Sequence, residues 1–152
     1  MCGILGGNNR QWDYEGGIQA IWHRGPDGQR VKRMDDITMA FARLAIIDLS
    51  SNGMQPMTSK DGRVTIVYNG EIYGYTQLKK DLEKKYEFFS TADTEVILNA
   101  YLEFGDEFVD KIDGMFAIAI YDQRTMKLKL FRDRTGIKPL YYYSDGENFA
   151  FA

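Results

Sequence analysis

The order of the apolar segments places the strongest limit on the fold of this 152-residue chain. Five segments have the length of β-strands and are bounded by Gly, Asp or Asn, and two further segments repeat apolar residues with helical spacing. Strands are expected at residues 4–5, 37–47, 64–68, 115–121 and 128–131, and helices at 76–86 and 94–104. Because the helices follow one another instead of alternating with strands, the pattern predicts an α+β fold with mainly antiparallel sheets.

The composition indicates one domain that acts on a small polar molecule. The chain is 44% hydrophobic, which is enough for one core, and its net charge of -3 comes from interspersed acidic and basic residues. No basic stripe marks a surface for nucleic acid or an anionic membrane, and no apolar run approaches the roughly 20 residues of a membrane span. The first residues lack the basic and apolar regions of a secretory signal, so a cytoplasmic protein is expected.

Several local patterns predict smaller elements. Residues 16–22 predict only a short helix, because they include two glycines and because residues 23–27 break the helix and lead into a loop. Residues 113–121 predict a strand covered on both faces, and residues 132–143 predict a structural strand, turn and strand. Residues 149–152 predict a strand in which the chain stops, so exposed sheet edges are expected.

The only cysteine, Cys2, directly follows Met1. One cysteine cannot form an internal disulfide, and one Cys with one His is not the ligand set of a zinc site, so no metal is expected. Removal of Met1 gives Cys2 an α-amine with a pKa of ~7.7 to 8.0, which can accept the proton of a thiol with a pKa of about 8.5. Cys2 would then be a nucleophile that carries its own base. If Met1 stays, that nitrogen is a peptide amide and the chain is expected to be inactive.

Two other interpretations of Cys2 stay open on the residues alone. A lone cysteine is often a small buried hydrophobic residue, and residues 2–6 can form a buried strand. Such a strand would also fix a nucleophile, with Gly3 leaving room for a substrate beside it. The second interpretation is a Cys–His dyad with His23, the only histidine, which lies beside a Gly-Pro break.

Seven motifs occur in one order along the chain. They are Met-Cys-Gly-Ile-Leu-Gly (1–6), His-Arg-Gly-Pro-Asp (23–27), Arg-Leu-Ala-Ile-Ile-Asp (43–48), Tyr-Asn-Gly-Glu-Ile-Tyr (68–73), Thr-Ala-Asp-Thr-Glu (91–95), Asp-Gly-Met-Phe-Ala (113–117) and Arg-Asp-Arg-Thr-Gly-Ile-Lys-Pro-Leu-Tyr (132–141). From Cys2 to its last residue, the chain resembles the glutaminase domain of glutamine-hydrolysing asparagine synthetases. These are class II glutamine amidotransferases with the N-terminal-nucleophile hydrolase fold. The motif at 23–27 is more similar to this branch than to the phosphoribosyl or hexosamine amidotransferases.

The resemblance implies a four-layer αββα sandwich, in which two mainly antiparallel sheets lie between helical layers and the nucleophile begins a central strand. It implies that residues 1–152 are a glutaminase domain that is incomplete at its C-terminus and has no cofactor of its own. A synthetase domain outside this chain, using ATP and Mg, would receive the ammonia. Aspartate is the first acceptor to consider, a sugar or another carboxylate is the alternative, and a homodimer is left open.

The resemblance also assigns the chemistry. Cys2 attacks the side-chain amide of L-glutamine, ammonia leaves, and water resolves the glutamyl thioester to glutamate. The Asn69 amide and the Gly70 backbone N–H form the oxyanion hole, in which losing one donor typically costs about 10²- to 10³-fold in kcat. On its residues alone, Asn69-Gly70 between two alternating segments is also a strong signal for a two-residue hairpin.

A cation is implied at one end of the substrate. Arg43 binds the α-carboxylate of glutamine, a task suited to a planar guanidinium that can contact both oxygens. Backbone groups of Leu44, Ala45, Ile46 and Ile47 line that side of the pocket. Without the resemblance, Arg43 would be interpreted as an exposed strand end or a member of a surface ion pair.

Anions are implied at the other end, where Glu71 and Asp93 hold the α-ammonium. Without the resemblance, Asp93 is equally well interpreted as the N-cap of the helix that follows it. Arg24 and Asp27 are expected to border the pocket without a chemical step. The alternative to an enzyme is a noncatalytic amino-acid-binding module that kept the pocket and lost turnover.

Overall fold

Two antiparallel sheets lie face to face in the computed structural model, which describes all residues from Met1 to Ala152. The five-stranded sheet has the order β2-β3-β1-β9-β8, and the four-stranded sheet has the order β4-β5-β6-β7. The strands are β1 (Gly3–Gly7), β2 (Gly28–Arg33), β3 (Thr38–Arg43), β4 (Met57–Thr58), β5 (Val64–Tyr73), β6 (Asp113–Asp122), β7 (Lys127–Arg132), β8 (Tyr142–Ser144) and β9 (Phe149–Phe151). The helices are α1 (Tyr14–Ala20), α2 (Thr76–Leu82) and α3 (Asp93–Phe104), with 3₁₀ turns η1 (Trp22–Arg24), η2 (Ser51–Gly53) and η3 (Gly105–Asp110).

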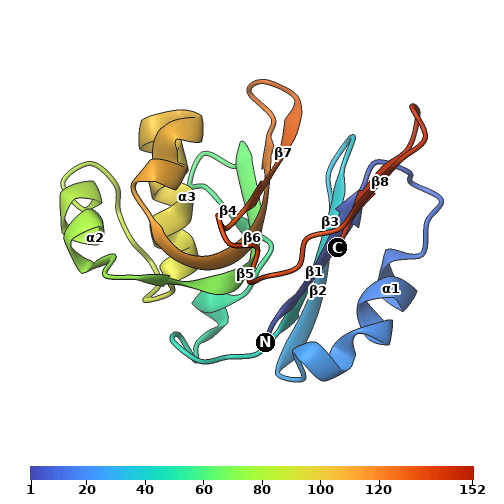
Figure 1. The fold of residues 1–152 in the computed structure, drawn as a ribbon, viewed down its shortest axis with the longest axis horizontal. Helices are drawn as coiled ribbons and strands as arrows, with labels where there is room; N and C mark the ends of the chain where they lie inside the picture. The colour runs from blue at the N-terminus through green and yellow to red at the C-terminus, as the bar shows by residue number, and fades with distance from the viewer.

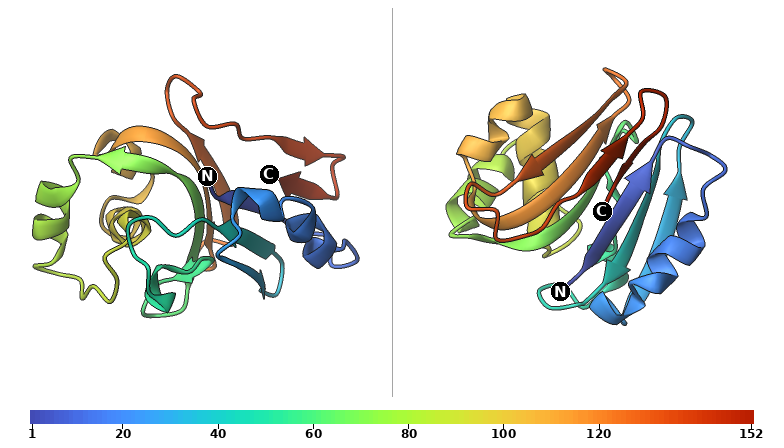
Figure 2. Two further views of the ribbon diagram at one scale, coloured as in Figure 1. Left: turned by 90° about the horizontal axis from the view of Figure 1, so that it is seen from below. Right: turned by 45° about the vertical axis from the view of Figure 1, so that its right-hand side comes forward.

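Helices cover the outer face of each sheet. Helix α1 packs on β1, β2 and β3, whereas α3 packs on β4 and β5. Figure 1 shows α2 and α3 on one side of the paired sheets and α1 on the other. The predicted α+β class and the αββα sandwich are therefore confirmed. Strand β1 lies between β3 and β9 (Figure 2), so the strand that follows Cys2 is central in its sheet, as expected.

Each gap between neighbouring layers holds its own hydrophobic cluster, and β6 contributes to two of them. Ala117, Ala119 and Tyr121 belong to the cluster between the sheets, whereas Ile118 and Ile120 belong to the cluster under α3. Successive side chains of a strand point to opposite faces, so a strand covered on both faces must be apolar at every position. The structure confirms the prediction of a doubly covered strand in this segment.

Strands β2 and β3 differ from the predicted pattern. Strand β2 forms where the sequence predicts a loop, and it pairs with β3 over six positions, from Gly28 opposite Arg43 to Arg33 opposite Thr38. An edge strand such as β2 needs no alternating apolar face of its own, because its buried neighbour supplies the hydrogen-bond partners. Strand β3 ends at Arg43, so residues 44–47, predicted as strand, form a loop instead.

Helix α1 forms in spite of its two glycines and begins two residues earlier than predicted. Asp13 Oδ1 accepts the backbone N–H of Gly16 at 2.8 Å, which caps the first turn, and Ile18 is buried against the sheet. Helix α3 matches its prediction to within one residue and ends where Gly105 adopts a φ of 59°. Helix α2 ends at Leu82, short of its predicted end.

No helix in the structure has both the length and the apolar character of a membrane span.

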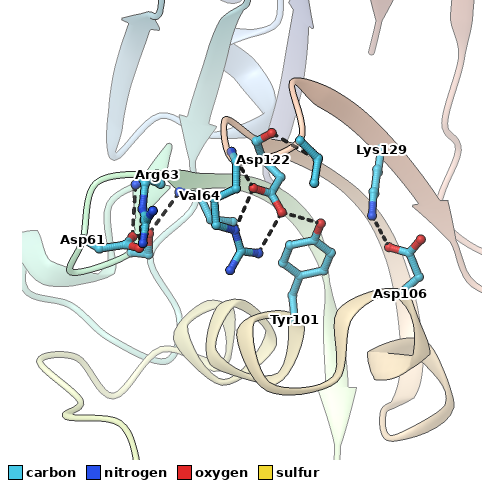
Figure 3. A network of polar contacts seen from close by, with 10 residues as sticks. Asp61, Arg63, Val64, Tyr101, Asp106, Asp122 and Lys129 are labelled. Carbon is cyan, nitrogen blue, oxygen red and sulfur yellow. Dashed lines mark hydrogen bonds and ion pairs between the residues drawn. The ribbon is translucent and has the colours of Figure 1, made fainter.

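The buried carboxylate of Asp122 joins the end of β6 to α3 (Figure 3). It accepts the Tyr101 hydroxyl at 3.0 Å and two guanidinium nitrogens of Arg124 at 2.9 and 2.7 Å. These hydrogen bonds hold the pKa of Asp122 below its usual value, with the Arg124 bond as the largest cause. Lys129 of β7 pairs with Asp106 of η3 beside this network. This end of the four-stranded sheet is therefore fixed to the helical layer by polar contacts.

Candidate active site

The Cys2 thiol lies at one end of the gap between the two sheets. Strands β1 and β3 pair with Gly3 opposite Ala42, so the next residue on each strand, Cys2 and Arg43, come together from distant parts of the sequence. Cys2 Sγ lies 3.4 Å from the Leu44 backbone nitrogen and 3.6 Å from the Leu44 carbonyl oxygen. The pairing of the strands therefore places the predicted nucleophile beside the predicted carboxylate clamp.

The raised pKa of the Cys2 thiol means that a base must lie close to it if the thiolate is to form. Burial raises the thiol pKa, and the Leu44 backbone N–H, the N-terminal ammonium and Arg43 only partly offset this effect. The thiolate is the reactive form, so a neighbouring group must accept the proton. With Met1 in place the Cys2 nitrogen is an amide, and removal of Met1 turns it into an amine at the nucleophile itself. His23 is exposed on η1 and does not line the cavity around the thiol, so the Cys–His dyad is not formed.

Asn69 and Gly70 lie inside β5 and not in a turn, so the hairpin interpretation is wrong. The strand continues through both residues, which pair with Ala117 and Phe116 of β6. A Cβ on Gly70 would lie 2.7 Å from the Tyr68 ring and 2.8 Å from the Phe116 Cα, so the close approach of the two strands requires glycine here. The Asn69 side chain lines the cavity of Cys2, and no hydrogen bond within the protein uses its amide.

Arg43 is a buried cation without an acidic partner. Its side chain is 8% exposed, and its guanidinium donates to the backbone carbonyl oxygens of Ser50, at 2.7 Å, and Asp48. None of the ion pairs in the structure includes it. The local interpretation of Arg43 as an exposed strand end or a member of a surface ion pair is therefore wrong. Two fixed hydrogen bonds orient a positive charge that a carboxylate can neutralise.

Asp93 is the matching buried anion. It is 6% exposed and accepts the Tyr68 hydroxyl at 2.9 Å. Ala92 occupies the N-cap position of α3 and Asp93 is the first helical residue, so the N-cap interpretation of Asp93 is wrong. Burial raises the pKa of Asp93, partly offset by hydrogen bonds from Tyr68 and from the backbone N–H groups of Ile72 and Thr94. A cation next to this carboxylate would stabilise its charged form.

All predicted site residues line one cavity of roughly 200 Å³. They are Cys2, Arg43, Leu44, Ala45, Ile46, Ile47, Asn69, Gly70, Glu71 and Asp93. Among these predicted residues, Glu71 is exposed, whereas Arg43 and Asp93 are buried, so the two predicted charges that water screens least are one cation and one anion. This arrangement suits a zwitterion. The structure holds no cluster of three or more His, Cys, Asp or Glu side chains that could bind a metal ion.

Tyr68 and Gln55 support the cavity and were not predicted to belong to the site. Gln55 Oε1 accepts the Tyr68 backbone N–H at 2.6 Å, and Gln55 Nε2 donates to Thr94 Oγ1 at 3.0 Å. These bonds join β5 to the start of α3, where Asp93 lies. The Tyr68 side chain points to the helical side of β5 and reaches Asp93 there. Only the alternation along β5, which places Tyr68 and Asn69 on opposite faces, could have indicated this role.

The loop after β3 is held by Asp48, Asp27 and η1. Asp48 accepts the backbone N–H groups of Ser50 and Thr91, each at 2.8 Å, and these partners together with the Ser50 hydroxyl lower its pKa to about 2. Asp27 accepts the Ala45 backbone N–H at 2.8 Å. Arg24 donates to the Cys2 carbonyl oxygen at 3.1 Å. Arg24 and Asp27 therefore border the site, as expected, through backbone contacts.

The fold and the site together define a class of protein. A thiol before the central strand of one of two stacked antiparallel sheets, facing a free amide on the other, is the arrangement of an N-terminal-nucleophile amidotransferase domain. A solved structure with this fold is the glutamine phosphoribosylpyrophosphate amidotransferase of Bacillus subtilis complexed with ADP and GMP, with a TM-score of 0.83 over 99% of this chain and 41% of that chain. At 18% identity, this likeness shows the fold alone.

Sequence comparison gives the family. The model of the glutamine amidotransferase domain matches residues 1–152, so the chain belongs to the glutamine amidotransferase family. Glutamine-hydrolyzing asparagine synthetase 2 of Bacillus subtilis (strain 168) is 47% identical over 128 residues, which are 84% of this chain and 17% of that protein. Asparagine synthetase 1 of the same strain is 40% identical and matches 100% of this chain, which spans 26% of it. The putative asparagine synthetase 2 of Methanocaldococcus jannaschii is 39% identical over 88% of this chain and 29% of that protein. The chain thus spans less than a third of each of these relatives, and the predicted resemblance is confirmed.

Proposed function

We propose that this domain, once Met1 is removed, hydrolyses L-glutamine to glutamate and ammonia through a thioester on Cys2. One observation carries the proposal: the only thiol of the chain lines a cavity that also holds a buried cation, Arg43, and a buried anion, Asp93, neither with a charged partner. The α-carboxylate of glutamine would pair with Arg43, and its α-ammonium with Asp93 and Glu71. These clamps would place the side-chain amide at Cys2.

The chemistry follows from the groups around the thiol. The Cys2 thiol gives its proton to its own α-amine, and the sulfur forms a bond with the amide carbon of glutamine. Asn69 Nδ2 and the Gly70 N–H stabilise the oxyanion. When the oxyanion collapses, the carbon–nitrogen bond of the side-chain amide breaks. The α-ammonium of Cys2 then returns the proton to the leaving ammonia. Water then attacks the thioester with the amine as base, which releases glutamate and regenerates the thiol.

We infer that a synthetase domain elsewhere in the protein uses the ammonia. The names of the relatives support an asparagine synthetase, in which an ATP- and Mg-dependent synthetase domain transfers the ammonia to aspartate. A sugar or another carboxylate is the alternative acceptor. We place the protein in the cytoplasm, where such a metabolic reaction would find its substrates.

Glutamate release by processed protein tests the proposal. Intact-mass measurement first shows whether Met1 is absent. The processed chain is then expected to produce equal amounts of glutamate and ammonia from glutamine, and Cys2→Ala is expected to abolish both without changing the circular dichroism spectrum. Equal turnover by the Ala variant would refute the role of Cys2.

The second candidate function is amino-acid binding without catalysis, and it applies to the chain that keeps Met1. With Met1 in place, as in this structure, the Cys2 nitrogen is an amide and cannot act as the base. This form is expected to bind glutamine without turning it over. Calorimetry with unprocessed and processed chains separates the two cases, because only the processed chain should show the heat of continuous turnover.

A further inference from the structure

Lys138 is a buried cation whose partners do not explain its position. It is 6% exposed, lines the same cavity as Cys2, and takes part in none of the ion pairs of the structure. Its Nζ lies 2.9 Å from Met1 Sδ, and a thioether is a weak acceptor. Burying an ammonium is costly unless a carboxylate or several strong acceptors compensate it. Neither is present around Lys138.

A rigid turn holds Lys138 in this place. Asp133, which is 4% exposed, accepts the backbone N–H of Lys138 at 3.0 Å and that of Phe116 at 3.1 Å. Arg132 Nε donates to the Lys138 carbonyl oxygen at 2.7 Å, and the chain reverses at Gly136 with a φ of 66°. The segment expected to be mainly structural therefore directs one ammonium into the cavity from the loop after β7.

The formal charges around the cavity balance before substrate binds, with three cations and three anions. They are Arg24 on η1, Arg43 on β3, Asp48 in the following loop, Glu71 on β5, Asp93 on α3 and Lys138. Asp48 is already satisfied by neutral donors, and burial raises the pKa of Tyr68, so that its hydroxyl stays neutral. Under the proposed function, the carboxylate of glutamine pairs with Arg43, and its single ammonium is shared between Asp93 and Glu71, so bound glutamine leaves the total charge of the cavity unchanged. Lys138 and the more distant Arg24, which contacts the Cys2 carbonyl, are then positive charges without a carboxylate partner.

We propose that Lys138 is a positioning residue that keeps the α-amine of processed Cys2 unprotonated at neutral pH. The inference rests on the proposed function. Removal of Met1 takes away the thioether next to Lys138 Nζ and creates an amine on Cys2, which lines the same cavity as Lys138. Two ammonium groups there would repel each other, so the neutral amine is favoured. A decrease of about one unit from a pKa of ~7.9 raises the neutral fraction at pH 7 from about a tenth to about half.

The pH profile of processed protein tests this role. Glutaminase kcat/KM is measured between pH 5.5 and 9.5 for the native chain, Lys138→Met, Lys138→Arg and the control Lys80→Met, which removes an exposed lysine of α2. For Lys138→Met, the acidic limb is expected to move up by about one pH unit, with a loss of about five- to tenfold at pH 6.5 and little loss at pH 9. Lys138→Arg and Lys80→Met are expected to keep the native profile.

Two results would overturn the inference. One is an acidic limb of Lys138→Met that superimposes on the native limb, and the other is an equal loss at every pH, which indicates a purely structural role. If Lys138→Met does not fold, the pH profile of Lys138→Gln, which removes the same charge, is compared with the native profile instead. The pH dependence of Cys2 alkylation by iodoacetamide, measured without glutamine, gives a second readout of the same proton transfer. A processed native chain without glutaminase activity at any pH would instead refute the proposed function.

Discussion

Asn69 is a residue whose proposed catalytic role can be separated from folding. Its side chain lies at the cavity and forms no hydrogen bond within the protein, while its backbone belongs to the β5–β6 ladder. Asn69→Ala is therefore expected to leave the melting temperature nearly unchanged and to lower kcat about 10²- to 10³-fold, because one oxyanion donor is lost. Thermal unfolding and steady-state kinetics check this. A large change in KM with a native kcat would assign Asn69 to substrate binding instead.

Asp93 is expected to control substrate affinity and its pH dependence. Asp93→Asn keeps the shape of the side chain but removes its charge, so KM for glutamine should rise about 30-fold or more, the equivalent of at least ~2 kcal/mol for an unpaired buried charge. Because the pKa of Asp93 is raised, its carboxylate becomes protonated at a higher pH than an exposed one. Native KM should therefore increase as the pH falls through the weakly acidic range, whereas the Asn variant should lose this dependence.

The exposed neighbour Glu71 provides the control for Asp93. Glu71→Gln removes a charge that water screens, so KM is expected to change less than in Asp93→Asn. An equal effect of the two substitutions, or a native KM that does not depend on pH, would contradict the proposed role of Asp93.

The stability of the protein depends on glycine at position 70 of β5 but not at position 17 of α1. In Gly70→Ala the new methyl group would collide with the Tyr68 ring and the Phe116 Cα, so the two strands must separate. A loss of about 1 to 3 kcal/mol in unfolding free energy is expected, together with a lower kcat. In Gly17→Ala the methyl group would lie 3.4 Å from the Leu5 side chain, an ordinary contact. This second variant should gain about 0.5 to 1 kcal/mol, because alanine favours the helix.

Urea unfolding of both glycine variants checks the argument. The two substitutions are chemically identical, so opposite signs would show that the environment of each glycine, and not the added methyl group, determines the effect. A stabilised Gly70→Ala would contradict the close approach of β5 and β6.

At the scale of the whole molecule, the polar network of Asp122 is remote from the cavity. Asp122 lies opposite Val64, whereas Ala117 lies opposite Asn69, which places the network roughly 17 Å along the ladder from the proposed oxyanion donors. Tyr101→Phe is expected to cost about 1 kcal/mol, or ~2 to 4 °C in melting temperature, and to leave kcat/KM unchanged. A large loss of activity at native stability would show unexpected coupling between the two ends of the sheet.

The same network predicts how stability depends on pH. The folded-state pKa of Asp122 is lowered, so its contribution is present above the unfolded value near 3.9 and is lost as the pH falls through the lower, folded value. Asp48, with its pKa lowered to about 2, acts in the same direction. Unfolding free energy should therefore decrease below about pH 4, and Asp122→Asn should weaken this dependence.

The sequence by itself determined the fold class, the family and ten of the residues that meet at the cavity. The apolar run of β6 indicated a doubly covered strand, because local alternation reports how many faces are buried. The position of Cys2 indicated an amine as base, because that chemistry needs only one residue. Ordered motifs indicated Arg43, Asn69 and Asp93, although each motif had a plausible local interpretation as well.

Only the tertiary structure decided between those local interpretations. Asn69-Gly70 has the composition of a turn, yet β5 continues through it, because pairing with β6 and packing between two layers outweigh a turn preference of about 1 kcal/mol. Strand β2 has little apolar pattern and forms because β3 supplies its hydrogen bonds. Lys138 and Gln55 reach the site through partners far away in sequence. Such contacts depend on which surfaces pack together, and a linear pattern of residues does not contain that information.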